Sequence, residues 1–85
     1  MRLRLRPYVS VTDTAAGIVL LDERSGRYWQ LNRSGSAVLR TLLAGGTPSF
    51  AAQHLSSSYG ITTERAAADI TALLDALRHA RLMIP

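Results

Sequence analysis

The 85-residue chain contains neither cysteine nor lysine. The absence of cysteine excludes disulfide bonds, thiol catalysis and cysteine-ligated metal sites. The absence of lysine excludes a Walker-type phosphate loop, because that loop needs a lysine to reach the phosphates. No apolar run reaches the roughly 18 residues that a membrane-spanning helix needs. Residues 1–6 alternate arginine with apolar residues, unlike a signal peptide, so we expect a cytoplasmic protein that does not associate with a membrane.

Catalytic motifs are also missing. The sequence has no nucleophile elbow, no H-E-x-x-H zinc site and no dinucleotide-binding fingerprint. His54 and His79 lie far apart and share no metal-ligand spacing. Asp22 and Glu23 are neighbours, but they fall in a predicted hairpin loop, where solvated charges are the simpler interpretation. We therefore expect no enzyme activity and no site for a metal or a cofactor.

The positive charge comes from one residue type, since all ten basic residues are arginine and the net charge is +4. The planar guanidinium group binds carboxylates and phosphates through paired hydrogen bonds. A basic surface suits an acidic peptide, an acidic protein or a nucleic acid, and charge alone does not distinguish among them. The length suits a single domain over residues 1–85.

Three short segments in the N-terminal part of the chain have the patterns of β-strands. In residues 2–11, polar and apolar residues alternate, which predicts a half-buried strand that lies at a sheet edge or is broken at Pro7. Residues 18–21 are an apolar second segment, and the aromatic-rich residues 27–31 are a third. The polar residues 22–26 end in glycine and form a hairpin loop between them. These patterns predict a three-stranded antiparallel meander.

The rest of the chain has helical periodicity in three segments. The expected N-terminal caps are Asn32 or Ser34, then Thr47, then Thr62 or Thr63. Glycines at positions 45, 46 and 60 end the first two helices, and the third is the longest, ending near residue 81. The expected apolar stripes are Phe50, Ala51, Leu55 and Tyr59 on the second helix and Ala66, Ala67, Ile70, Leu73, Leu74, Leu77 and Ala80 on the third. Residues 82–84 can pack back onto the domain.

Strands followed by helices are typical of the α+β class, with the helices against one face of a small antiparallel sheet. A short turn containing Gly60 joins the second and third helices, which therefore resemble a helix-turn-helix. Together with the three strands, this order predicts a winged-helix-like architecture.

Several segments, taken in order, resemble a known family. They are residues 17–22 (GIVLLD), 26–32 (GRYWQLN), Ser34-Gly35, 42–46 (LLAGG), Tyr59-Gly60, Asp69-Ile70 and Leu82-Met83. Their order and spacing resemble the PqqD-like family, the leader-recognition domains of ribosomally made, modified peptides. Trp29 and the short length are most similar to the small leader-binding partner of the split peptidase in lasso-peptide pathways.

The resemblance implies a mechanism and a set of site residues. In this family the leader of a precursor peptide adds a strand to the edge of the third strand and lies against the third helix. Such strand addition takes affinity from main-chain hydrogen bonds and selectivity from side-chain pockets. The implied peptide-binding residues here are Arg27, Tyr28, Trp29, Gln30 and Leu31 on the strand and Ala67, Ile70, Thr71, Leu74 and Arg78 on the helix. The implied partners are a separate cysteine peptidase that removes the leader and, as a further candidate, a cyclase.

Other functions stay open at this point. A peptide chaperone of pyrroloquinoline quinone formation has a similar size and belongs to the same family. DNA binding through the helix-turn-helix is the main alternative from another class, although the third helix begins with Glu64, three alanines and Asp69, which are poor phosphate ligands. We therefore expect no nucleic-acid partner. Leu31, Leu73 and Leu77 have a competing interpretation as plain core residues.

Overall fold

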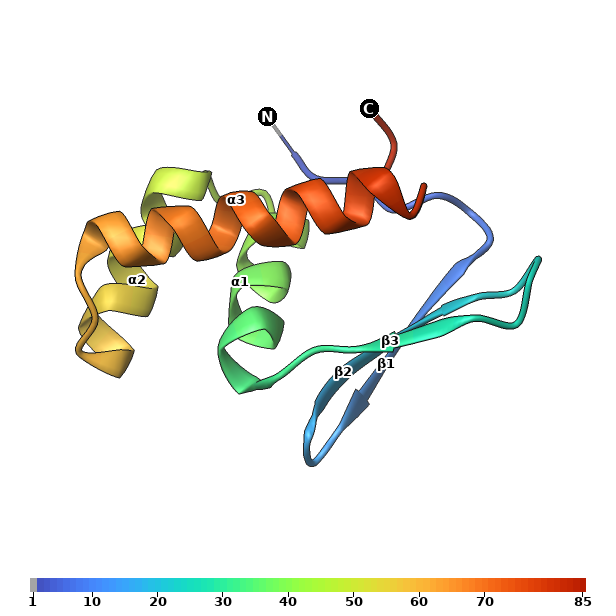
Figure 1. Cartoon of the computed structure of the whole chain (residues 1–85), viewed down its shortest axis with the longest axis horizontal. Coiled ribbons are helices and arrows are strands. Elements are labelled where there is room, and N and C mark those ends of the chain that lie inside the picture. The colour runs from blue at the N-terminus through green and yellow to red at the C-terminus, as the bar shows by residue number, and fades with distance from the viewer. Residues whose placement is uncertain (1) are drawn as a thin grey trace.

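The computed structural model describes residues 2–85 and contains three strands followed by three helices (Figure 1). The elements are β1 (Val9–Thr14), β2 (Gly17–Asp22), β3 (Tyr28–Gln30), α1 (Arg33–Leu43), α2 (Pro48–Tyr59) and α3 (Thr63–His79). The predicted α+β class is thus confirmed, and so is the prediction that the third helix is the longest.

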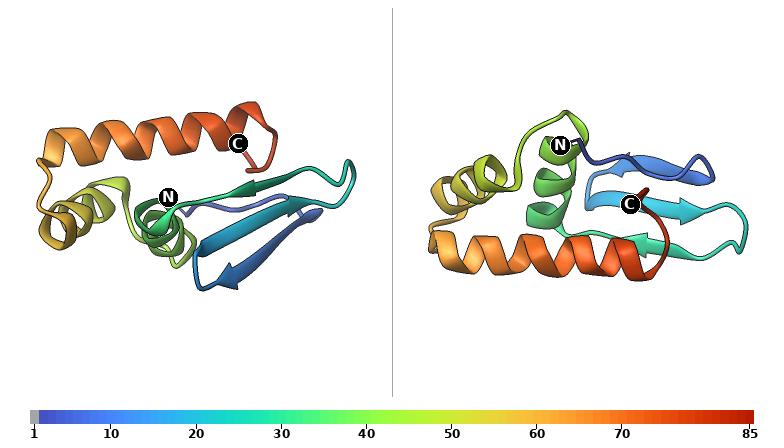
Figure 2. Two further views of the ribbon diagram at one scale, coloured as in Figure 1. Left: turned by 60° about the horizontal axis from the view of Figure 1, so that its bottom comes forward. Right: turned by 90° about the horizontal axis from the view of Figure 1, so that it is seen from above.

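The strands form one antiparallel sheet in the order β1-β2-β3. Val9 pairs with Asp22 at one end of the first hairpin, and Leu20 pairs with Trp29 in the second. The three helices lie on the same side of this sheet, and α3 runs alongside β3 rather than β1 (Figure 2). The other face of the sheet therefore has no helix against it.

The first strand begins later than the sequence pattern predicted. The chain turns at Pro7 and Tyr8, and β1 continues to Thr14, three residues past the predicted end of the strand at residue 11. Pro7 has no N–H to donate to a ladder, which explains the break. Val11, an apolar residue of the alternating segment, is 44% exposed although it pairs with the buried Leu20.

The alternating N-terminal segment instead pairs with the C-terminus. Leu5 forms an antiparallel bridge with Met83, the Arg6 N–H donates to the Leu82 carbonyl at 2.9 Å, and the Ile84 N–H donates to the Arg4 carbonyl at 2.8 Å. Leu3, Leu82 and Met83 are buried. The return of the C-terminal residues to the domain is confirmed, and residues 82–84 lie beside residues 4–6 (Figure 1).

Side-chain caps define where the helices start. The Asn32 side chain accepts from the Gly35 N–H, Thr47 from the Phe50 N–H, and Thr62 from the Arg65 N–H. Each cap satisfies one of the backbone donors that a helix leaves free at its first turn. Gly60 ends α2 in the left-handed conformation with φ of 65°, which glycine adopts without steric cost.

The core lies between the inner face of the sheet and the three helices. Its buried members include Ile18, Leu20, Val38, Leu39, Leu42, Leu55, Ala66, Ile70 and Leu77. Three stripe predictions were wrong, since Phe50 is 58% exposed, Tyr59 is 42% exposed and Ala67 is exposed. These residues lie at the margins of their stripes, where the helix surface curves away from the core.

A buried serine attaches α1 to the sheet. The Ser36 hydroxyl accepts from the Ile18 N–H at 2.8 Å and donates to the Asn32 carbonyl at 2.7 Å. The side chain is fully buried, so these hydrogen bonds replace its contacts with water. Ser36 therefore has a structural role at the point where β3 leads into α1.

Candidate functional site

The outer edge of β3 is free. β3 is the last strand of the sheet, and β2 occupies only its inner edge. A free strand edge presents unpaired N–H and C=O groups that another extended chain can bind. Such an edge is the first requirement for a site that accepts a peptide as an additional strand.

The hydrogen bonds of the sheet show which groups face this edge. The Leu31 N–H donates to the Ile18 carbonyl at 2.8 Å, and the Arg27 carbonyl accepts from the Asp22 N–H at 2.8 Å. In an antiparallel ladder, the residues that bond to a given neighbour alternate along the strand. The N–H and C=O groups of Tyr28 and Gln30, which lie between, therefore point to the free edge.

A groove separates β3 from α3. Every Cα atom of β3 lies more than 8 Å from every Cα atom of α3. A cavity of about 530 Å³ occupies this side of the helix. Its lining residues are Gln30, Leu31, Asn32, Ser34, Gly35, Val38, Leu55, Arg65, Asp69, Ala72 and Leu73. The buried Val38 and Leu55 form an apolar floor, and the free strand edge lies on one side.

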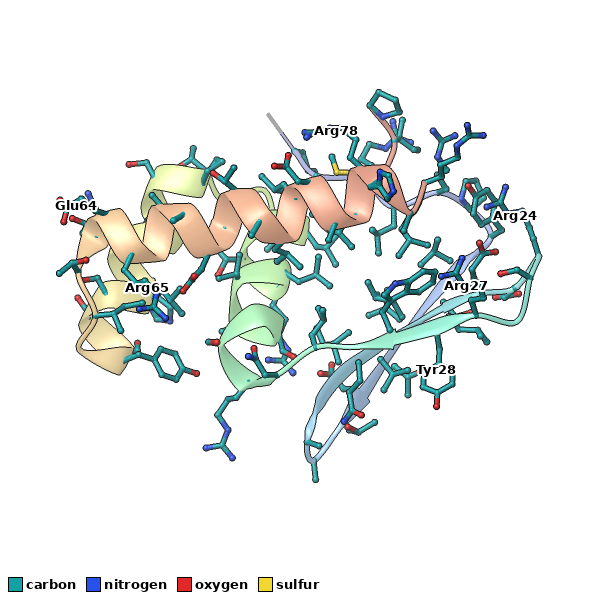
Figure 3. All side chains as sticks on the ribbon, viewed as in Figure 1. Arg24, Arg27, Tyr28, Glu64, Arg65 and Arg78 are labelled. Carbon is teal, nitrogen blue, oxygen red and sulfur yellow. The ribbon has the colours of Figure 1, made fainter. Side chains whose placement is uncertain are left out.

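The inner face of β3 contributes partly exposed apolar side chains. Trp29 and Leu31 are half-buried against the core, as is Leu73 on the facing helix. The Arg27 guanidinium carbon lies 5.4 Å from the centroid of the Trp29 ring, within the range of a cation–π contact. Arg27 extends from the α3 side of β3, and Tyr28 extends from the opposite side (Figure 3). The groove side of the strand thus offers apolar surface and one cation.

The charged residues of the groove wall are only loosely paired. Arg65 Nε lies 3.7 Å from Asp69 Oδ1, and both side chains are largely exposed. An exposed pair of this kind contributes little to stability. Both side chains can therefore exchange this contact for one with a bound chain at small cost.

The hairpin before β3 is held by a different pair. Asp22 accepts hydrogen bonds from the Arg24 backbone N–H at 2.9 Å and from the Arg24 guanidinium at 3.0 Å and 3.2 Å. The guanidinium hydrogen bond is the main reason why the pKa of Asp22 lies below its usual value. Glu23, its neighbour, instead accepts from the Ser10 hydroxyl. The two carboxylates thus have separate structural partners.

The structure divides the residues that the resemblance had suggested between two places. Gln30 and Leu31 line the groove beside α3. Trp29 lies in β3 and Arg27 directly precedes the strand, whereas the Tyr28 side chain extends from its opposite side. The helix residues lie elsewhere. Ala67, Ile70, Thr71 and Leu74 line a second cavity of about 680 Å³ between α2 and α3, with Pro48, Ala52 and Glu64 among its other residues. Arg78 is paired with Asp75 at 3.0 Å.

This placement differs from the expected wall of the groove. The flank of α3 beside β3 carries Arg65, Asp69, Ala72 and Leu73, none of which the resemblance had assigned to the site. Ala67 and Thr71 lie on the other flank because the buried Ala66, Ile70 and Leu77 fix the rotation of α3 against the core. In the sequence, a small residue beside the apolar stripe was the one sign of a peptide-binding flank. Ala72 gives this sign on the flank beside β3, and Ala67 gives the same sign on the flank beside α2, so the sequence did not distinguish them.

Among residues 2–85, no three histidine, cysteine or acidic side chains lie close enough together to hold a metal ion. Among the same residues, none of the helices combines the length and the apolarity needed to cross a bilayer.

The chain is similar to known proteins in sequence and in fold. The family described as "Coenzyme PQQ synthesis protein D (PqqD)" matches residues 17–83. A solved structure described as "Lasso peptide synthetase B1 complexed with the leader peptide" is 42% identical, with a TM-score of 0.93 and full coverage of both chains. A second, "TbiB1 in Complex with the TbiA(beta) Leader Peptide", has 22% identity, a TM-score of 0.84 and coverage of 94% and 93%, and so shares the fold. No curated protein is similar enough in sequence to count as a match.

Proposed function

The chain belongs to the PqqD family, and from this premise we propose that it binds the leader segment of a ribosomally made precursor peptide. The 42% identical structure is described as a lasso peptide synthetase component bound to a leader peptide, which supports a lasso-peptide precursor as the partner. In this proposal the protein binds the leader and does not modify it.

One observation carries the proposal: β3 has a free edge directly beside the groove along α3. A leader in extended conformation pairs with that edge as a fourth strand of the sheet. Neighbouring strands lie about 4.8 Å apart, so the added strand lies on the α3 side of β3, where the cavity of about 530 Å³ opens. The N–H and C=O groups of Tyr28 and Gln30 form its hydrogen bonds.

Side chains of the leader supply the selectivity. Alternate residues of an added strand point to the groove, where Leu31, Leu73 and the floor of Val38 and Leu55 offer apolar contacts. Burying one large apolar side chain contributes roughly 1.5–3 kcal/mol. Strand hydrogen bonds add affinity that does not depend on the leader sequence. Arg27, at the hairpin end of β3, suits an acidic leader residue.

The partner enzymes belong to the same proposal. A domain that binds a leader without cleaving it must deliver the precursor to a separate enzyme. We infer that this enzyme is a cysteine peptidase that removes the leader, with a cyclase as a further recipient, and that delivery takes place in the cytoplasm. The absence of catalytic motifs from the sequence motivates this division of labour.

Amide hydrogen exchange tests the proposal at single residues. The probe is a synthetic copy of the leader peptide bound by the 42% identical protein. Without peptide, the Tyr28 and Gln30 amides should exchange fast, whereas the Leu31 amide, already bonded to Ile18, should be protected. With peptide, Tyr28 and Gln30 should become protected. Binding without this protection would reject strand addition, and no binding at all would reject the proposed function.

A further inference from the structure

The outer face of the sheet carries apolar side chains that remain exposed among residues 2–85. Tyr28 is 70% exposed, the highest value among the large apolar residues, and Leu21 is 36% exposed. Tyr28 extends away from the helices (Figure 3), all of which lie on the other side of the sheet (Figure 2). Leu21 and Tyr28 are cross-strand neighbours, so their exposed side chains lie together on this face at the edge of the sheet.

The strand register arranges this face in two rows across the sheet. One row contains Ser10, Leu21 and Tyr28, and the other contains Thr12, Val19 and Gln30. In the first row, Ser10 already donates to Glu23 at the β1 side. The open end of that row is therefore the Tyr28 ring, at the free edge of β3.

An added strand would extend both rows by one residue. Side chains of a strand alternate between its two faces, so only half of the paired leader residues can enter the groove beside α3. The others point to the outer face, and the one opposite Tyr28 has its Cβ about 4.5–5.5 Å from the Tyr28 Cβ. This geometry follows from strand pairing and does not depend on the direction of the leader.

We propose that Tyr28 is a specificity-determining residue that contacts an outward-facing leader side chain, on the side of the sheet opposite the groove. The inference rests on the proposed function, because it requires the leader to pair with β3. The contacted leader residue is apolar or aromatic, since it extends a row formed by Leu21 and Tyr28. Aromatic pairs with aromatic or β-branched residues are among the favourable cross-strand pairs.

The proposal also predicts a pattern in the leader. The residue next to the apolar one pairs with Trp29 and faces the groove. The residue after that pairs with Gln30 and faces outward again, where a polar side chain is tolerated. The leader is therefore contacted on both faces of the sheet, and its outward position opposite Tyr28 is not free to vary.

Binding measurements with paired substitutions test this inference. The protein variants are Tyr28→Thr, which keeps a good strand former at this position, and Tyr28→Phe, which keeps the ring. Tyr59→Ala on α2 is the control, since Tyr59 is also exposed but far from β3 in sequence and on another element. The probes are the fluorescein-labelled leader of the 42% identical protein and copies with each residue in turn replaced by serine.

Tyr28→Thr should weaken binding of the parent leader by about threefold to fivefold, the upper part of the range of roughly 1.4-fold to fivefold expected for one cross-strand pair. Tyr28→Phe and Tyr59→Ala should bind like the parent protein. One leader position should lose affinity on serine substitution with the parent protein but not with Tyr28→Thr. Equal binding by Tyr28→Thr and the parent, or a loss that is the same for every leader copy, would overturn the inference. Failure of the parent protein to bind any leader would remove the proposed function and the inference together.

Discussion

The two flanks of α3 each border a cavity, but they differ in what lies across the gap. On one flank the cavity of about 530 Å³ lies beside the free edge of β3. On the other, the larger cavity of about 680 Å³ lies beside α2. A strand edge offers free N–H and C=O groups, whereas the backbone groups within a helix are bonded to one another. The size of a cavity is therefore a poorer guide to peptide binding here than the backbone groups beside it.

The comparison is sharpest for two alanines of α3 that are both exposed. Ala72 lines the cavity beside β3, and Ala67 lines the cavity beside α2. Ala72→Arg places a long charged side chain in the space for the leader and should weaken binding at least tenfold, or about 1.4 kcal/mol. Ala67→Arg makes the same change on the other flank and should bind like the parent. Fluorescence anisotropy with the labelled leader measures both.

The reverse result would move the site. If Ala67→Arg lost binding and Ala72→Arg kept it, the leader would lie between α2 and α3, on the flank that the family resemblance first suggested. Both variants change an exposed alanine in a helix to arginine, which has a similar helix propensity. Their unfolding free energies should therefore agree closely, and circular dichroism with urea titration checks that both are folded.

A smaller effect is expected from removing one hydrogen-bond donor at the strand edge. The Gln30 N–H points away from β2, so Gln30→Pro removes a donor that the sheet does not use. Proline is tolerated on an edge strand in this orientation. Leader affinity should fall by roughly threefold to tenfold, because a net hydrogen bond contributes about 0.5–1.5 kcal/mol.

The α2 flank provides the contrast for this variant. Gln53→Ala changes an exposed α2 residue that lines the other cavity and should leave leader affinity unchanged. Urea unfolding should show that Gln30→Pro remains folded. A folded Gln30→Pro protein with full affinity would contradict main-chain pairing at β3 while leaving the groove side-chain contacts possible.

The smallest predicted effect concerns the hairpin that leads into β3, on the β3 side of the comparison. Arg24 lowers the pKa of Asp22 in the folded protein. A carboxyl group with a lowered folded-state pKa stabilises the fold above its unfolded pKa of about 3.9, and this stabilisation is lost as the pH falls through the folded-state value. Urea midpoints should therefore fall below about pH 4, and Asp22→Asn should show a smaller fall. An equal fall in both proteins would assign the acid sensitivity to other carboxylates.

Local sequence signals predicted most of the elements. The caps at Asn32, Thr47 and Thr62 and the glycine at position 60 mark helix ends through hydrogen bonds and backbone geometry that involve only nearby residues. The first strand was the exception. The alternation before Pro7 was real, but its apolar residues are used by pairing with residues 82–84, a contact between the two ends of the chain.

The same local sequence signals predicted only part of the candidate site. Order along the chain placed β3 last in a meander, so its outer edge could be expected to be free. Strand alternation then placed Trp29 and Leu31 on the same face of the third strand. Tyr28 is exposed because the helices cover the other face of the sheet. Strand alternation separates the two faces but does not tell which of them the helices cover.

The sequence by itself determined that α3 has an apolar stripe with small residues on both sides of it. Only the tertiary structure decided which side meets β3. The rotation of α3 about its axis is set by Ala66, Ile70 and Leu77, which are buried in the shared core. That packing turns Ala72 and Leu73 toward the strand edge and Ala67 toward α2. Helical periodicity is local to one element, whereas the rotation is a property of several elements packed together.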